Sequence, residues 1–431
     1  MRSAYLAPTP FKVIHEGDIS SKVYLPKQTS IPYKIRDLQM FSPKLFTNCT
    51  PPEDNDYNRN ISVKYANGIY VMGRNTNGTA YSMDGITWHN SQGDWDPTYN
   101  SIIYLEHANG IWVASTQVGL YYSEDGITWS KSNAPTEWFD YCTYANGIWL
   151  AGGYYKAGTY YSTDGKSWTP CSPCYRTVCA AYANGLWVAC IDEVSMGALA
   201  YSTDGINWTV APGTTDLGTI FQCCCYGNNK WVACGKYWSP NYDGCRLYYS
   251  TDGINWSPAN NELSFKHTGF DQVYFNNGVF IARSTSNNNQ TISSTIDGVK
   301  VYWYTYAGLY WSIDGVNWNH WIVDCSDLYG EGSITNPGDS LRAPANLTYT
   351  GSVWIACDVG SMYISKDGKH WTKLEFWGED QMWYLDTYYL YSSYTNDTLF
   401  ILGEATEDST GVAYFKPKHP LIYKFGGELK C

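Results

Sequence analysis

The chain has 431 residues, a formal net charge of −12 at pH 7 and an aromatic content of 17%. The aromatic and other apolar residues of such a chain are sufficient for a large buried core. The acidic balance, without a run of Lys or Arg, argues against nucleic acid and anionic membranes as partners. Because no stretch has the length and apolarity of a signal-peptide core or a membrane span, we expect a soluble protein made in the cytosol.

The first sixty residues contain neither of the two phrases that recur in the rest of the chain. Proline is frequent here, which favours an extended conformation over regular sheet. We therefore expect residues 1–60 to form an extended arm or anchor and residues 61–426 to form the folded body. The prolines of this segment are Pro8, Pro10, Pro26, Pro32, Pro43, Pro51 and Pro52.

The first recurring phrase is Asn-Gly, or a close relative of it, between β-forming residues. Both residues of an Asn-Gly pair accept a positive φ, so the phrase predicts a tight β-hairpin. Its seven copies are YANGIYVM (65–72), HANGIWVA (107–114), YANGIWLA (144–151), YANGLWVA (182–189), YGNNKWVA (226–233), FNNGVFIA (275–282) and YTGSVWIA (349–356).

The second recurring phrase, Ser-x-Asp-Gly-x-x-Trp, follows each copy of the first. Its aspartates are 41, 39, 40, 48, 62 and 53 residues apart, and a period near forty indicates blades or solenoid turns. Ser and Asp can satisfy backbone donors in a turn, and Trp is a large apolar wedge, so we assign these residues to the scaffold. They are Asp84, Asp125, Asp164, Asp204, Asp252, Asp314 and Asp367, with Trp88, Trp129, Trp168, Trp208, Trp256, Trp318 and Trp371.

Each repeat contains four strand-like segments in succession, which in the second repeat are SIIYLEH, IWVAS, GLYYS and TWSKS. Four antiparallel strands per forty-residue unit is the blade of a β-propeller. We therefore predict an all-β propeller of four-stranded antiparallel blades. The blades are expected at about 61–90, 100–131, 140–170, 178–210, 221–258, 270–320, 345–373 and 384–426.

The eighth repeat, at the C-terminal end, lacks the Asp-Gly-x-x-Trp turn. It contains TYYLYSSY (387–394), TLFILGE (398–404), GVAYF (411–415) and LIYKF (421–425). It forms either a blade of its own or a blade completed by an N-terminal strand, and we favour eight blades over the seven-bladed alternative. The sixth repeat carries an insertion at 293–306 that has the pattern of an extra hairpin.

Cysteines and histidines do not form a ligand pattern. Cys190, Cys234 and Cys357 occupy a position that holds Ser115 or Gly152 in other repeats, which is typical of small buried thiols. The CSPC pair at 171–174 has no second pair or His at zinc spacing, so we expect neither a metal nor a cofactor. Which cysteines pair, if any do, stays open.

The Ser-x-Asp-Gly-x-x-Trp phrase resembles a shortened Asp-box, the repeat of sialidase-like β-propellers, over roughly residues 61–373. The resemblance implies a structural turn between the third and fourth strands of each blade. A sialidase also needs converging arginines and a Tyr nucleophile, and the eight arginines here suggest no such cluster. Without an HExxH or Gly-x-Ser-x-Gly motif either, we predict no catalytic residue and a non-enzymatic protein, with a sialidase-like hydrolase as the alternative.

Strand order places the two constant turns on one face of each blade and the loops of variable length on the other. Aromatic residues in these variable loops suit sugar rings or a protein partner, because both ligands match a flat apolar surface with a polar rim. Packing of the same rings on the blades is the competing interpretation. The candidates are Trp95, Tyr99, Trp138, Phe139, Tyr154, Tyr155, Trp238, Tyr242 and Trp377.

The composition, rich in Tyr, Asn, Trp and Gly and poor in Arg, resembles that of propeller modules of bacteriophage tail and adsorption proteins. The resemblance implies a structural or recognition component of a virion, made in the host cytoplasm. Its arm would join other virion proteins, and its loop face would contact a host surface glycan or a neighbouring virion protein. A bacterial lectin or scaffold is a further alternative, and homo-oligomeric assembly stays open.

Overall fold

The computed structural model describes residues 46–48, 60–74, 78–96, 98–99, 101–153, 158–192, 197–237, 247–260, 269–285, 291–296, 299–304, 308–321, 346–358, 361–374, 388–396, 398–405 and 421–426. Within these ranges the regular elements are β-strands, labelled β1 to β35. Contacts divide the chain into two compact units. One contains residues 1–144, 162–169 and 345–431, and the other contains residues 145–161 and 170–344.

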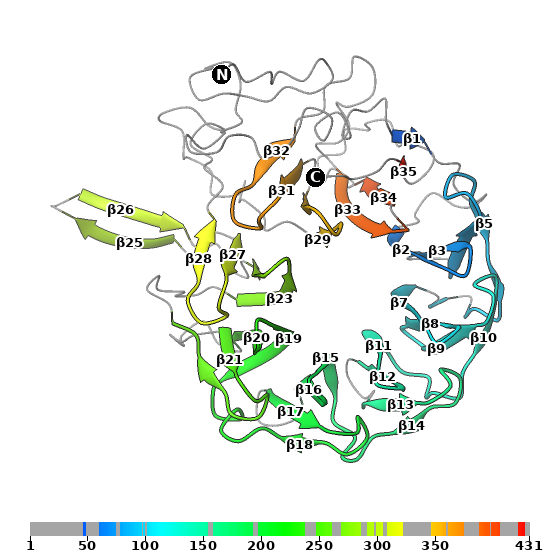
Figure 1. The fold of residues 1–431 in the computed structure, drawn as a ribbon, viewed down its shortest axis with the longest axis horizontal. Helices are drawn as coiled ribbons and strands as arrows, with labels where there is room; N and C mark the ends of the chain where they lie inside the picture. Colours follow the sequence, from blue (N-terminus) through cyan, green and yellow to red (C-terminus); the bar gives the residue numbers. More distant parts are fainter. Residues whose placement is uncertain are drawn as a thin grey trace. The chain divides into compact units, whose positions relative to one another are not determined.

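The strands of the described residues form nine sheets, and seven of these are four-stranded. In most repeats the sheet order follows the chain order, and the repeats can be followed by colour in Figure 1. The sheet of the second repeat has the same order with a fifth strand, β6, paired in parallel with β10. The predicted class, an all-β propeller of four-stranded antiparallel blades, is confirmed, and the seven four-stranded sheets match the seven-bladed alternative.

The strands of the first four repeats lie close to the predicted segments. They are β2 (Asn60–Ala66), β3 (Ile69–Arg74), β4 (Thr79–Ser82), β5 (His89–Asn90), β6 (Gln92–Gly93), β7 (Ile102–Ala108), β8 (Ile111–Thr116), β9 (Gly119–Ser123), β10 (Thr128–Lys131), β11 (Tyr141–Ala145), β12 (Ile148–Gly152), β13 (Tyr160–Ser162), β14 (Thr169–Pro170), β15 (Thr177–Ala183), β16 (Leu186–Ile191), β17 (Ala198–Ser202) and β18 (Thr209–Val210).

The later repeats continue the pattern, apart from the insertion in the sixth. Their strands are β19 (Thr219–Gly227), β20 (Lys230–Tyr237), β21 (Leu247–Ser250), β22 (Ser257–Pro258), β23 (Gly269–Asn276), β24 (Val279–Thr285), β25 (Thr291–Ile296), β26 (Val299–Tyr304), β27 (Leu309–Ser312), β28 (Asn319–Trp321), β29 (Asn346–Tyr349), β30 (Trp354–Asp358), β31 (Ser361–Ser365), β32 (Thr372–Leu374), β33 (Tyr388–Thr395), β34 (Thr398–Ala405) and β35 (Leu421–Gly426). The predicted insertion hairpin is β25 paired with β26.

The Asn-Gly phrases form the predicted tight turns between the first and second strands. In the second repeat, Asn109 has a φ of 51° and Gly110 a φ of 79°. Two successive residues with positive φ give the turn a twist that matches the twist of the flanking strands. The same pair of positive φ values occurs at residues 67–68, 146–147, 184–185 and 277–278.

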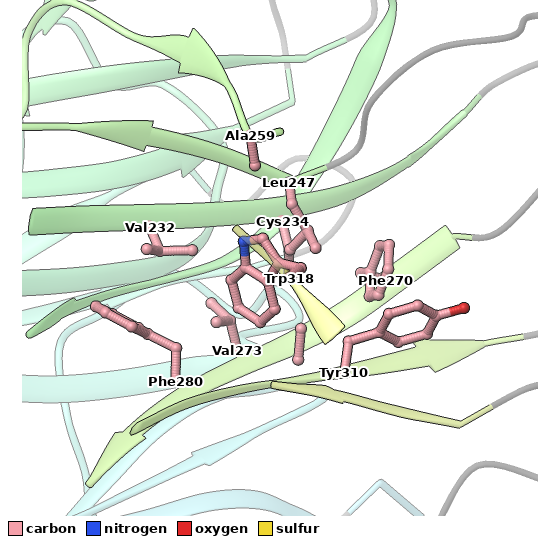
Figure 2. Close-up of a cluster of buried hydrophobic side chains, with 10 residues drawn as sticks. Val232, Cys234, Leu247, Ala259, Phe270, Val273, Phe280, Tyr310 and Trp318 are labelled. Atoms are coloured by element: carbon pink, nitrogen blue, oxygen red, sulfur yellow. The ribbon is translucent and has the colours of Figure 1, made fainter. Parts of the chain in front are cut away.

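The core lies between neighbouring repeats and is built around tryptophan. Trp318, from the second phrase of the sixth repeat, packs with Val232 and Cys234 of the preceding repeat and with Phe280 of its own (Figure 2). Trp129 packs in the same way with Ile69 and Val71 of the preceding repeat. Each such indole therefore fills the space between two sheets, and its removal is expected to cost about 3–5 kcal/mol.

The last sheet combines both ends of the chain, in the order β1-β35-β34-β33, where β1 is Phe46–Asn48. Phe46 to Asn48 pair antiparallel with Phe425 to Tyr423, so the predicted arm at 1–60 must be corrected: β1 belongs to this sheet. The physical reason is that β35 would otherwise present an unpaired strand edge. The segment at 411–415, predicted as a strand, lies outside the described residues.

The last sheet is hydrogen-bonded to the first repeat. The N–H of Tyr65 donates to Oγ1 of Thr395 at 2.9 Å, and Oγ of Ser393 donates to the carbonyl of Val63 at 2.6 Å. These pairs are 330 residues apart in the chain. Side-chain hydroxyls on β33 thus bind the backbone of β2 and join the two ends of the repeat array.

We predict that removal of β1 destabilises the protein. A protein lacking residues 1–48 should unfold about 3 °C below one lacking residues 1–45, because three backbone pairs with β35 are lost. Thermal unfolding followed by circular dichroism compares the two truncations. Equal unfolding temperatures would show that β1 adds nothing to the stability of the last sheet.

Candidate functional site

The Ser-x-Asp-Gly-x-x-Trp phrase forms a hydrogen-bonded turn, here called the box turn, between the third and fourth strands of a repeat. In the fourth repeat, Oγ of Ser202 donates to Oδ1 of Asp204 at 2.9 Å and accepts the N–H of Gly205 at 2.9 Å. Oδ1 of Asp204 also accepts the N–H groups of Ile206 and Asn207, both at 2.8 Å. The carboxylate is thus occupied by its own turn.

Hydrogen bonds keep the box aspartates ionised. Burial opposes ionisation of Asp314, but the N–H groups of Asn317 and Val316 outweigh it and lower the pKa of this carboxyl to about 2. The pKa of Asp84 is lowered to about 2 in the same way, against burial, by Thr87 and Ile86. The pKa of Asp204 is also lowered. These carboxyls are therefore poor candidates for a general acid near neutral pH.

The box turns also bind the strand that leaves the preceding repeat. The N–H of Ser172, after the third repeat, donates to the carbonyl of Ile206 at 2.8 Å, and the N–H of Trp208 donates to the carbonyl of Ser172 at 2.8 Å. The N–H of Trp168 donates to the side-chain oxygen of Asn133 at 2.7 Å. These contacts make the box turns part of the connection between repeats.

A hollow of about 280 Å³ lies among the first strands of three repeats, β2, β7 and β33. The sequence did not reveal this hollow. Alignment of the first strands could nevertheless have suggested that Lys64 and Glu106 occupy equivalent positions in their repeats. Polar groups from all three strands line the hollow. Those groups include Ser62, Lys64, Glu106, His107, Ser393 and Thr395.

An ion pair dominates the charge of this hollow. Nζ of Lys64 lies 2.6 Å from Oε1 of Glu106, and the same oxygen accepts the backbone N–H of His107 at 3.0 Å. Burial lowers the pKa of His107 and outweighs Glu106, which raises it, while Lys64 lowers it further. The His107 ring packs on Trp112 with ring centroids 4.6 Å apart. Of the residues lining the hollow, Glu106 alone carries a carboxylate, so the lining offers polar binding groups without a carboxylate pair.

Four of the nine aromatic residues predicted to contact a ligand are described. Tyr99 is 54% exposed and Trp138 is 37% exposed. Phe139 is fully buried, and this prediction was wrong for it, since a ring in the core cannot contact a ligand. Trp95 is half-buried and packs on Tyr121 and Trp129, with ring centroids 4.7 Å and 5.5 Å away. The other five candidates, Tyr154, Tyr155, Trp238, Tyr242 and Trp377, lie outside the described residues.

Three of the arginines are described, and each is engaged close to its own strands. Arg74 is buried and donates to the side-chain oxygen of Asn90 at 2.8 Å. Arg176 forms an ion pair with Asp192, and Nε of Arg283 donates to Asp271 at 2.8 Å. Among the described residues, no group of three or more His, Cys, Asp and Glu side chains is placed to hold a metal ion. Nor does any helix there have the length and apolarity needed to cross a membrane.

No protein-family model matches the chain, and no curated protein matches it. Similar solved structures include BamB from Moraxella catarrhalis, with a TM-score of 0.49 and 8% identity over 90% of this chain and 99% of that one. YCF48 from Cyanidioschyzon merolae has a TM-score of 0.42 and 11% identity over 78% and 99% of the two chains. A GH74 xyloglucanase from Xanthomonas campestris has a TM-score of 0.42 and 10% identity over 87% of this chain and 55% of its own. Because these TM-scores lie below 0.5, the fold rests on the sheet topology and not on these likenesses.

We predict that Asp204→Asn destabilises the fold by about 1 kcal/mol at pH 7, because a neutral amide is a weaker acceptor for the two N–H groups. The folded pKa of Asp204 lies below its unfolded value, so the charge stabilises the protein above about pH 4, and this contribution is lost as the pH falls through the folded pKa. Chemical denaturation should therefore show a smaller difference from the wild type at pH 3 than at pH 7. Asp216→Asn, at an exposed position outside the box turns, is the control. A difference that grows on acidification would contradict this role.

We also predict how the neighbours of His107 set its titration. Its pKa should lie below the ordinary value for histidine, fall further in Glu106→Gln and rise in Lys64→Met, since the first change removes an anion and the second a cation. The pKa is measured by NMR with histidine labelled at Cε1, and His107→Gln assigns the signal. Shifts of the opposite sign in the two variants would refute the assigned electrostatics.

Proposed function

We propose that the chain is a non-enzymatic recognition propeller that binds its ligand through the connections between successive repeats. The observation that carries the proposal is the exposure of Tyr99 and Trp138 on two consecutive connections of this kind, β5 to β7 and β10 to β11. Each connection runs from the fourth strand of one repeat to the first strand of the next. Flat rings beside polar groups suit the apolar face of a sugar or a protein side chain.

The backbone at Tyr99 is held in place by a local turn. Oδ1 of Asp96 accepts the N–H groups of Thr98 and Tyr99, both at 2.8 Å. The two hydrogen bonds lower the pKa of Asp96 and so favour its charged form. A ring on a fixed backbone loses less conformational entropy on binding than a ring on a free loop, which supports a role in recognition.

Trp138 is held by its neighbour in the chain. The N–H of Phe139 donates to the carbonyl of Thr116 at 3.0 Å, and the Phe139 side chain is fully buried. The N–H of Glu137 donates to the carbonyl of Pro135 at 2.9 Å. The segment is therefore anchored beside Trp138 by Phe139 and held locally by the bond at Glu137, and we assign Phe139 the role of anchor in place of a ligand contact.

The chemistry of the described residues supports binding over hydrolysis. A glycosidase of the usual type needs two carboxyl groups on either side of the scissile bond. The box aspartates are occupied by backbone donors, and Glu106 is paired with Lys64. The described arginines are likewise engaged within their own repeats.

We further propose that the ligand is a host surface glycan or a neighbouring protein and that the protein acts in a bacteriophage tail or adsorption apparatus. The composition and the repeat phrase support this setting. The attachment role predicted for the arm at 1–60 is now proposed for residues 1–45, because β1 is part of the last sheet.

The test is binding of purified protein to a glycan array and to host cells, with sugar release followed in parallel. Tyr99→Ala and Trp138→Ala should each weaken binding about tenfold or more, since loss of a stacking ring typically costs above 1 kcal/mol. The matched controls are Met83→Ala and Ile313→Ala, which remove exposed apolar side chains from box turns.

Retained binding in both aromatic variants, or equal loss in the Met83 and Ile313 controls, would contradict the proposed surface. Sugar release by the wild type would contradict the non-enzymatic assignment. Unfolding temperatures of all four variants separate loss of a contact from loss of the fold.

A further inference from the structure

Two thiols from neighbouring repeats lie close together at equivalent positions on their first strands. Sγ of Cys179, on β15, is 3.9 Å from Sγ of Cys223, on β19. Each of these cysteines directly follows a register shift in its pairing with the second strand, between Thr177 and Cys179 and between Phe221 and Cys223. A bulge of this kind redirects the side chains that follow it, which explains why the two thiols converge.

Exposure distinguishes this pair from the buried thiols nearby, and Cys225 shares it. Cys179 and Cys223 are both half-buried, whereas Cys190, Cys224 and Cys234 are buried in the core between repeats. The buried thiols pack as small apolar side chains, in agreement with the sequence analysis. A small oxidant in solution can therefore reach the Cys179 and Cys223 pair in preference to the buried thiols.

We propose that Cys179 and Cys223 form a redox modification site at which a small-molecule disulfide, such as oxidised glutathione, introduces a cross-link between two consecutive repeats. The sulfur atoms must approach by about 2 Å to reach bonding distance. The site needs no metal and none of the residues assigned to recognition.

The reaction proceeds in two exchanges. The Cys179 thiolate attacks one sulfur of oxidised glutathione, which forms a mixed disulfide and releases one glutathione thiolate. Cys223 then loses its proton to solvent and attacks the Cys179 sulfur, which forms the protein disulfide and releases the second glutathione. Two protein thiols are oxidised, and one molecule of oxidised glutathione is reduced to two of the thiol form.

The order of attack follows from the surroundings of Cys223. The contact with Cys179, and then burial, raise the pKa of the Cys223 thiol well above its ordinary value. A neutral thiol is a weak nucleophile, so we place the first attack at Cys179. Deprotonation of Cys223 becomes easier as the pH rises, and the cross-link should form faster at higher pH.

The cross-link would respond to the surroundings of the protein. Thiols stay reduced in a cytosol that is rich in reduced glutathione and pair in an oxidising medium. A disulfide between residues 44 apart restricts the unfolded chain, and the unfolding temperature should rise by about 4 °C.

The experiment treats the full chain with oxidised glutathione at pH 7 and pH 8.5 and maps disulfides by mass spectrometry of unreduced peptides. We expect a peptide that joins Cys179 to Cys223, faster formation at pH 8.5, and a rise in unfolding temperature that dithiothreitol reverses. Cys179→Ser and Cys223→Ser should abolish both the joined peptide and the rise. Cys225→Ser, a half-buried thiol on the same strand, is the control and should keep both.

Absence of the joined peptide from oxidised wild-type protein would overturn the proposal, and this result does not depend on whether any variant folds. A reversible rise in unfolding temperature that persists in Cys179→Ser would overturn it as well, because another pair of cysteines would then be responsible.

Discussion

The structure depends on one recurring arrangement, in which a serine and an aspartate satisfy the backbone of a turn and a tryptophan fills the space between two sheets. The second repeat illustrates how little freedom this leaves. Gly126 has a φ of 76°, and a Cβ there would lie 2.8 Å from Cγ2 of Val71 in the preceding repeat. Any other residue would therefore meet both backbone strain and a steric clash. In this repeat Oδ1 of Asp125 accepts the N–H groups of Ile127 and Thr128, at 2.8 Å and 2.7 Å.

This constraint divides each repeat into parts with different roles. The box turn joins the third and fourth strands and binds the residue that leaves the preceding repeat, as Ser172 shows with Ile206 and Trp208. A change in the box turn therefore affects two sheets at once. The connections that carry Tyr99 and Trp138 need only a few anchors, such as Asp96 and Phe139, and can hold different side chains and lengths between them. Function is accordingly expected where the scaffold leaves most freedom.

Local patterns made much of the fold predictable. Asn109 and Gly110 adopt the positive φ values that their turn requires, and Trp318 packs between sheets as predicted for a large apolar scaffold residue. Long-range pairing was harder, because the pairing of β1 with β35 joins segments without a shared motif. Candidate site residues were the least predictable. Phe139 and Trp138 are adjacent aromatics with opposite exposure, and the sequence does not reveal that the backbone of Phe139 binds the carbonyl of Thr116. The pairing of Lys64 with Glu106 required knowing that β2 and β7 are neighbours.

The most direct test of the division between scaffold and recognition surface is hydrogen–deuterium exchange of the protein alone and in complex with its strongest-binding glycan or protein partner. The account predicts slower exchange on binding in the peptides that contain Tyr99 and Trp138. Exchange in the box turns at 202–208 and 312–318 should stay unchanged. Protection concentrated in the box turns, or in the hollow around Lys64 and Glu106, with the two connections unaffected, would contradict it.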